Sequence, residues 1–238
     1  MAERPRVIAV VGMTSEARII AGDGVTVVIG GGDSAGLERK LEAALDLGAA
    51  SPWLLSFGVC GALSPDLKAG DLVIGSCVLW GERRRPTDAA WTSRLAEALP
   101  KARLADIAAS DTMIASVAEK GALHEATGAA AVDMESHIVA RLAERYALPF
   151  AVVRAVSDAA DHTLPSAALA GLKPDGSADI FAVLRSLAAQ PRQLVGLIRI
   201  ARDAGAALQA LKTSVEAVLG SMPPPPPHER PAAPDSGP

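Results

Sequence analysis

The stretch Val132-Asp133-Met134-Glu135-Ser136, taken together with Arg154-Ala155-Val156-Ser157-Asp158, decides how this chain folds. The first block ends a short apolar run and opens a helical pattern over 136–146. The second block ends a Val-rich, β-prone run over 149–156. Each block thus carries an acid where a buried strand ends, and in open α/β sheets such strand ends are where ligands bind. Two acids beside apolar residues at one rim favour a site that handles hydroxyls and a proton rather than a metal ion.

Length and composition favour one large α/β domain. The chain has 238 residues, of which 50% are apolar and 3% are aromatic, so Ala, Val and Leu fill the core. This composition is typical of helices packed on a Val-rich sheet and argues against a sandwich or a disulfide scaffold. The net charge of -4, with no basic cluster beyond 83–85, gives no indication of nucleic-acid binding.

Cysteine usage and the apolar runs indicate a cytoplasmic protein. Cys60 and Cys77 lie in apolar runs without metal-ligand spacing, which is typical of reduced, buried thiols. The apolar run at 7–11 is too short for a signal peptide, and no uncharged apolar run is long enough to span a membrane.

The apolar periodicity predicts strands and helices that alternate along the chain. Strands are expected at 6–12, 25–29, 53–57, 72–79, 103–109, 128–132 and 149–156. Helices are expected after a cap at Thr14 or Ser15, and at 37–45, 86–99 (after a loop), 114–127, 136–146, 179–189 and 193–219. From Met222 onward five consecutive prolines indicate a disordered tail. We therefore expect one domain over 1–219, followed by a tail at 220–238.

Two glycine-rich segments follow predicted strands. Gly30 to Ala35 fits a loose G-x-G-x-x-A dinucleotide fingerprint, but the next strand lacks the acid that this fingerprint requires. A tight turn is the better interpretation there. The second segment, 57–62, lets backbone groups approach a ligand closely, although a sharp turn of the chain at the end of the strand needs the same glycines.

Several motifs together resemble the nucleoside phosphorylase and nucleosidase superfamily. Gly58-Val59-Cys60-Gly61-Ala62-Leu63 and Gly70-Asp71-Leu72-Val73 look like its G-x-x-G-G-L and G-D-h-V patterns, where h is apolar. The blocks ending at Ser136 and Asp158 are similar to its ribose-binding M-E and base-binding S-D motifs. Gly12-Met13 with Glu16 resembles the loop that carries the water-activating acid of methylthioadenosine/S-adenosylhomocysteine nucleosidases. The resemblance implies a three-layer α/β domain with a mixed central sheet covered by helices on both faces.

Within this superfamily the chain resembles the hopanoid-associated phosphorylases most. The features that carry this resemblance are Ser56-Phe57-Gly58, Lys120 in an Ala-rich helix, the run from Asp133 to His137, and the apolar C-terminal helices. It implies cleavage of adenosylhopane with release of adenine in hopanoid biosynthesis. A methylthioadenosine/S-adenosylhomocysteine nucleosidase, a non-catalytic nucleoside sensor and a dinucleotide-binding oxidoreductase stay open as alternatives.

The resemblance also implies roles for individual residues. Asp158, oriented by Ser157, would protonate the leaving purine at N7, and Glu135 would accept hydrogen bonds from the ribose hydroxyls. Glu16 would position or deprotonate the attacking water. Each acid can equally be a helix-start acid or a local cap. The implied lining of the substrate pocket comprises Gly12, Met13, Val59, Gly61, Met113, Ile114 and Met134, with Met113 standing where relatives have a Phe.

The sequence leaves open whether water or phosphate is the nucleophile. Phosphate needs cationic donors, commonly Arg, and Ser56 occupies the position where related bacterial phosphorylases carry one. Arg154 and Arg18 are candidates to compensate, and a structural ion pair is an equal interpretation for Arg154. We expect no metal and no cofactor, with inorganic phosphate as the one potential co-substrate.

Apolar residues late in the chain bear on the substrate and partners. Leu164, Leu169, Leu172, Phe181 and the helix over 193–200 give apolar surface near the expected mouth of the site. They either cover the sheet or a subunit interface, or they form a channel for the lipid part of a nucleoside. Homo-oligomers are common among the relatives, and the apolar last helix leaves peripheral membrane contact open.

Overall fold

A mixed sheet of eight strands forms the centre of the computed structural model, which describes residues 7–46, 52–165 and 194–222. The strand order is β2-β1-β3-β7-β6-β4-β5, and β8 pairs with both β3 and β4. The strands are β1 (Val7–Val11), β2 (Val25–Ile29), β3 (Trp53–Ala62), β4 (Leu72–Trp80), β5 (Arg83–Pro86), β6 (Arg103–Ala109), β7 (Ala131–Asp133) and β8 (Phe150–Asp158). The helices are α1 (Thr14–Ile20), α2 (Ser34–Asp46), α3 (Ala89–Ala98), α4 (Val117–Thr127), α5 (Ser136–Arg145) and α8 (Leu194–Gly220).

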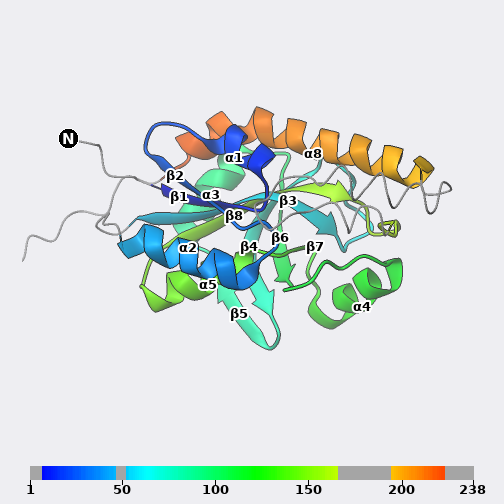
Figure 1. The fold of residues 1–238 in the computed structure, drawn as a ribbon, viewed down its shortest axis with the longest axis horizontal. Helices are drawn as coiled ribbons and strands as arrows, with labels where there is room; N and C mark the ends of the chain where they lie inside the picture. Colours follow the sequence, from blue (N-terminus) through cyan, green and yellow to red (C-terminus); the bar gives the residue numbers. More distant parts are fainter. Residues whose placement is uncertain (1–6, 47–51, 166–193, 223–238) are drawn as a thin grey trace, which may run out of the picture.

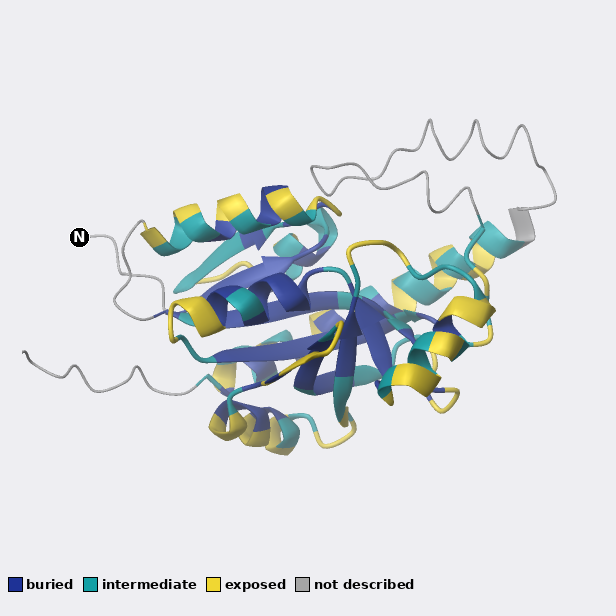
Figure 2. Ribbon diagram, turned by 90° about the horizontal axis from the view of Figure 1, so that it is seen from below, coloured by how far each residue is buried: buried dark blue, intermediate teal, exposed yellow. Residues whose placement is uncertain are grey.

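Helices cover both faces of the sheet (Figure 1), and the alternation of side chains along β8 shows why. Val152 and Val156 pack in the core cluster that contains Leu37 and Leu41 of α2 and residues of α5. Ala151, Val153 and Ala155 pack in the opposite cluster, with residues of α1, α3 and α8. Successive strand residues point to opposite faces, so a strand with apolar side chains on both faces has to be covered twice, and Figure 2 shows the central strands mostly buried. The predicted three-layer α/β fold with a mixed sheet is confirmed.

Strand β3 is longer than the sequence predicts. The segment 58–62, expected as a loop, continues the strand, because Gly58 to Cys60 pair with Arg154 to Val156 of β8. Gly61 and Ala62 then pair with β7 in the antiparallel sense. This extension brings the end of β7, which leads to Glu135, and the end of β8, which carries Asp158, to either side of one strand.

Other boundaries also differ from the prediction. The short edge strand β5 was not predicted, because its Arg-rich sequence has no apolar signal, and it forms through pairing with β4. Helix α4 begins at Val117 rather than at Ile114, because Ser116 and Glu119 form a capping box there. The same helix ends as predicted, at Gly128 in the left-handed conformation with φ 71°.

The last helix, α8, runs along one face of the sheet (Figure 1) and confirms the predicted C-terminal helix. Its residues Ala207, Leu211 and Val218 are fully buried. Within the described ranges, no helix is long and apolar enough to cross a membrane. The predicted helix over 179–189, the residues Leu169, Leu172 and Phe181, and the tail from 223 onward lie outside the described residues.

Candidate active site

Glu16 is held at the start of α1 by three backbone N–H groups. Its Oε2 accepts hydrogen bonds from the amides of Gly12 and Met13, both at 2.8 Å, and its Oε1 accepts one from Val59, also at 2.8 Å. The residue is 1% exposed. Glu16 thus joins the end of β1 to the middle of β3, two segments that lie far apart in the sequence.

The predicted cap of α1 by Thr14 or Ser15 is wrong. Both residues lie inside the helix, and the N-cap residue is Met13, whose free N–H is bound by the Glu16 carboxylate. Burial raises the pKa of Glu16, while Arg154 and the three amides oppose this shift. A buried carboxyl with a raised pKa is suited to accept a proton near neutral pH.

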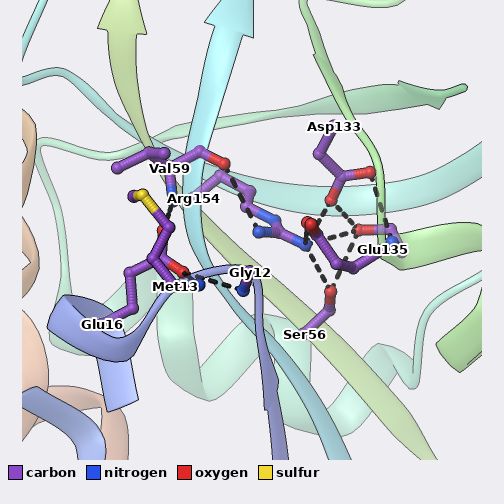
Figure 3. Close-up of polar contacts among 9 residues, drawn as sticks. Gly12, Met13, Glu16, Ser56, Val59, Asp133, Glu135 and Arg154 are labelled. Carbon is purple, nitrogen blue, oxygen red and sulfur yellow. Dashed lines mark hydrogen bonds and ion pairs between the residues drawn. The ribbon is translucent and has the colours of Figure 1, made fainter. Parts of the chain in front are cut away.

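Arg154 lies at the centre of the polar cluster (Figure 3), between the Glu16 loop on one side and the acids after β7 on the other. Its Nη2 is 2.5 Å from Asp133 Oδ2 and 3.2 Å from Glu135 Oε2, and it donates to Ser56 Oγ at 2.7 Å. Its Nη1 donates to the carbonyl of Val59 at 3.4 Å. Arg154 is fully buried; burial lowers its pKa, but the surrounding carboxylates outweigh burial and raise it.

Glu135 occupies the N-cap position of α5 without capping it. Its side chain accepts no hydrogen bond from the helix; instead Asp133 Oδ1 accepts from the Ser136 amide at 3.3 Å. The Ser136 hydroxyl also donates to Asp133 Oδ2. Asp133 therefore caps the start of α5, a role that the sequence did not indicate for it. The Glu135 carboxylate instead pairs with Arg154 and lies beside Gly12.

The pKa of Glu135 is shifted first by burial and then by its charged neighbours. Burial raises the pKa of Glu135 to about 7, with Asp133 and Glu16 adding to the rise and Arg154 opposing it. Near neutral pH this carboxyl therefore exchanges a proton readily, whereas an exposed glutamate is fully ionised there.

Two glycines allow the acids to come this close to the backbone. A Cβ atom on Gly12 would lie 2.8 Å from Glu135 Oε1 and 3.5 Å from Glu16 Oε2. A Cβ atom on Gly58 would lie 2.7 Å from Glu16 Oε1 and 2.8 Å from Arg154 Nη1. The glycine at each position is therefore required by space, and Glu135 and Glu16 lie on either side of Gly12.

The second predicted acid, Asp158, ends β8 opposite Gly61 of β3. Its Oδ2 is 2.5 Å from Nζ of Lys120, and its Oδ1 accepts from the Ser157 hydroxyl at 2.9 Å. The Ser157 hydroxyl also lies 3.1 Å from the carbonyl of Cys60. Asp158 thus has a buried cation beside it rather than the purely apolar surroundings that the neighbouring valines predict.

In the sequence, Lys120 stands out only through the resemblance to one subfamily, and nothing there indicates its partner. No local pattern links positions 120 and 158, which are brought together by the packing of α4 beside the end of β8. The available signal was a lysine in the first turns of an Ala-rich helix, where the helix dipole disfavours a cation.

The remaining predicted residues differ in exposure. Gly12 is buried, whereas Met13, Val59, Gly61, Ile114, Met134 and Ser157 are half-buried. Met113 is 37% exposed, and the segment before it is tied to β7 through the Ser110 amide, which donates to the carbonyl of Asp133 at 2.9 Å. Arg18 is exposed on α1. The structure therefore brings Glu16, Glu135 and Arg154 together, places Asp158 across β3, and leaves Arg18 on the surface.

A cavity of about 390 Å³ lies elsewhere, lined by residues of β5, α5 and the start of β8, including Arg85, Thr87, Glu144 and Phe150. Phe150 and Asp158 are the two ends of β8, so this cavity is at the opposite end of the strand from the acid. That Glu135 and Asp158 face one common hollow stays a prediction. In the described part of the chain, no three His, Cys, Asp or Glu side chains are grouped so as to hold a metal ion.

Residues 20–189 match the family model described as the phosphorylase superfamily. The chain belongs to this superfamily. The match confirms the predicted superfamily and, with it, the prediction of an enzyme. No curated protein matches the sequence significantly.

Solved structures share the fold at low sequence identity. A 5′-methylthioadenosine/S-adenosylhomocysteine nucleosidase from Colwellia psychrerythraea in complex with adenine superposes with a TM-score of 0.68 at 15% identity, covering 93% of this chain and 97% of that one. The Neisseria meningitidis nucleosidase with methylthio-immucillin-A gives 0.66 at 16% identity, covering 91% and 100%. The Helicobacter pylori futalosine hydrolase gives 0.61 at 16% identity, covering 92% and 98%.

Proposed function

We propose that this superfamily member hydrolyses the N-glycosidic bond of an adenine nucleoside, with water rather than phosphate as the nucleophile. The observation that carries the proposal is the gathering of Asp133, Glu135 and Glu16 around the single cation Arg154. Two unit charges about 4 Å apart interact by roughly 4 kcal/mol near a protein surface. Because Asp133 already pairs with Arg154, and any ionised fraction of Glu135 and Glu16 adds negative charge, a phosphate dianion would find no unpaired positive charge here, whereas a neutral water needs none.

Glu16 is fixed in a geometry that suits a base for water. A carboxylate has about four lone-pair directions, and the amides of Gly12, Met13 and Val59 occupy three of them. The remaining direction is on Oε1, and it can accept a hydrogen bond from the attacking water. Because three amides hold the carboxylate, no reorientation is needed when the water gives up its proton.

Glu135 supports the proposed sugar site on the other side of Gly12. An ionised Glu135 can accept hydrogen bonds from the 2′- and 3′-hydroxyls, and half-buried Met134 can pack under the ring. These hydrogen bonds strengthen as the sugar becomes oxocarbenium-like, so they lower the barrier as well as the dissociation constant.

Asp158 supports the proposed base site. Loss of adenine is difficult unless the purine leaves protonated, and a carboxyl at the end of β8 can give a proton to N7. Ser157 fixes the orientation of this carboxyl through the hydrogen bond at 2.9 Å. One of the similar nucleosidase structures holds adenine, which supports a purine as the leaving group.

We further propose that the substrate carries an apolar 5′ substituent, with adenosylhopane as the first candidate. Exposed apolar side chains, Met113, Val117 and Ile198, lie on the segment before α4, on α4 and on α8. The amide of Leu164 donates to the carbonyl of Ala115 at 2.9 Å, which joins the segment before α4 to the chain that follows Asp158. Apolar surface on α4, the helix whose Lys120 pairs with the proposed base acid, would suit a hydrocarbon group better than a polar one.

A panel of nucleosides tests both parts of the proposal. Purified protein should release adenine from adenosylhopane in phosphate-free buffer, and H₂¹⁸O should place label on the ribosyl product detected by mass spectrometry. Formation of ribosyl phosphate only when phosphate is present would contradict hydrolysis. Efficient cleavage of methylthioadenosine or S-adenosylhomocysteine with adenosylhopane untouched would favour the nucleosidase alternative, and binding of every nucleoside without release would favour a sensor.

A further inference from the structure

The buried pair formed by Lys120 and Asp158 is the feature of the proposed site that the superfamily resemblance does not assign. The Lys120 side chain is 0% exposed, and Asp158 Oδ2 lies 2.5 Å from its Nζ. A lysine so completely buried is rare unless it is paired, and its position in the first turns of α4 adds an unfavourable helix dipole. We therefore expect Lys120 to have a function that an apolar residue of similar volume could not perform.

The surroundings of Nζ show which partner holds the proton. Three acceptors lie around it: Asp158 Oδ2, the carbonyl of Ala159 at 2.8 Å and the carbonyl of His162 at 3.0 Å. An ammonium offers three N–H donors and no acceptor, so it satisfies all three. A neutral amine would turn its lone pair toward one of these oxygens. The geometry therefore stores a proton on Lys120, with Asp158 as the ionised partner.

This arrangement conflicts with a resting Asp158 that is already the acid. Asp158 Oδ2 accepts from Nζ and Oδ1 accepts from the Ser157 hydroxyl, and a carboxylate that only accepts hydrogen bonds has no proton to give to the base. The two residues nevertheless hold one transferable proton between them, which passes to the carboxyl when negative charge develops on the purine. Because the pair is buried, no bulk water competes for this transfer.

We propose that Lys120 is the proton store for the leaving base, a positioning residue that acts through Asp158; this inference rests on the proposed function. An Nζ–H bond breaks and its proton moves to the Asp158 carboxylate, and the carboxyl then protonates N7 as the C1′–N9 electron pair leaves with the purine. Water forms the new C1′–O bond and gives its proton to Glu16. Lys120, left as a neutral amine, regains a proton from solvent after product release, and Glu16 returns one to solvent.

The proposal predicts that Lys120 affects the cleavage rates of two substrates differently when they share a sugar but differ in their leaving group. Adenine needs a proton to leave, whereas p-nitrophenolate is stable as an anion and needs none. We therefore compare an adenine nucleoside with the p-nitrophenyl riboside that carries the same 5′ substituent. Lys120→Arg keeps the positive charge and the ion pair, but a guanidinium does not give up its proton in a protein. Lys120→Gln removes the charge and keeps a donor.

We expect both variants to lose adenine release by about 10²-fold or more, a typical contribution of acid catalysis, while p-nitrophenol release stays close to that of the wild type. The control is Lys40→Gln, which should change neither rate, since Lys40 is an exposed lysine whose Nζ donates to the carbonyl of Ile29 at 2.9 Å. Normal adenine release by Lys120→Arg would overturn the proposal, because the pair would then be purely structural. A parallel loss of both activities in both variants, from any cause including misfolding, would also overturn it. A wild-type protein that cleaves the p-nitrophenyl riboside but no nucleoside would instead contradict the proposed function itself.

Discussion

Arg154 and Asp133 form an ion pair of 2.5 Å in which both side chains are fully buried. Asp133→Asn should lower the free energy of unfolding by about 3–5 kcal/mol, because the neutral amide leaves part of the Arg154 charge buried without its partner. Urea unfolding followed by circular dichroism measures this difference. The matched control is Glu42→Gln in the exposed pair with Arg145, whose nitrogen and oxygen lie 2.5 Å apart. It should cost less than about 1 kcal/mol, and equal small losses in the two variants would show that the buried pair is unimportant for stability.

Replacing the proposed water base should separate chemistry from binding. Glu16→Gln keeps an oxygen that can face the amides of Gly12 and Met13, but it cannot take a proton from water. We expect adenine release to fall by about 10²–10⁴-fold, while calorimetry still detects nucleoside binding. Turnover at the rate of the wild type would remove Glu16 from the mechanism.

The space beside Gly12 gives a second test of the site. Gly12→Ala should weaken nucleoside cleavage strongly, because the new Cβ atom would lie 2.8 Å from Glu135 Oε1 and force that carboxylate to move. Gly121→Ala in α4 is the control, since no heavy atom lies within 4 Å of its added Cβ. It should leave activity unchanged and stabilise the helix by about 0.5–1 kcal/mol. Steady-state kinetics of the two variants measures the effect on activity, and thermal melting measures the effect on stability. Unchanged kinetics in Gly12→Ala would contradict the proposed place of Glu135.

The pKa of about 7 at Glu135 predicts how pH affects substrate binding. Only the ionised carboxylate accepts hydrogen bonds from both ribose hydroxyls, so the KM for the nucleoside should fall as pH rises through about 7. In Glu135→Gln the side chain does not titrate, and this dependence should disappear. A KM of the wild type that is constant between pH 6 and pH 8 would argue against Glu135 as the ribose ligand.

The same group predicts a change of stability with pH. Its pKa is raised in the folded protein from an ordinary value of 4.5, so the folded state binds more protons than the unfolded chain between these two values. The stabilisation from the proton on Glu135 is complete below the unfolded value and is lost as pH rises through about 7. A shift of this size corresponds to on the order of 3 kcal/mol. Urea unfolding at pH 5 and pH 8 should show this loss in the wild type and a smaller one in Glu135→Gln.

Much of the fold was predictable because its signals are local. The apolar runs at β1, β2, β4 and β8 are strands in the structure, and Gly128 ends α4 as predicted. The signal failed where pairing rather than composition makes a strand. Gly58 to Ala62 look like a loop in sequence but are held in β3 by two neighbouring strands, and Arg83–Pro86 becomes β5 only by pairing with β4.

The candidate site divides in the same way. Glu135 and Asp158 were singled out in the sequence because each lies at the end of a buried strand, and Glu16 because its loop resembles that of the nucleosidases; their roles stay predictions. What each acid contacts was not predictable. The cap of α1 by Glu16, the cap of α5 by Asp133 and the cation beside Asp158 all depend on side chains that long-range packing orients.

The sequence by itself determined the layered α/β architecture, the superfamily and the strand ends at which the acids lie, because periodicity and motif spacing are properties of neighbouring residues. Only the tertiary structure decided that Arg154 is enclosed by carboxylates and that Lys120 is paired with Asp158. The physical reason is that charge state depends on burial and on distances of a few ångströms between residues far apart in the chain.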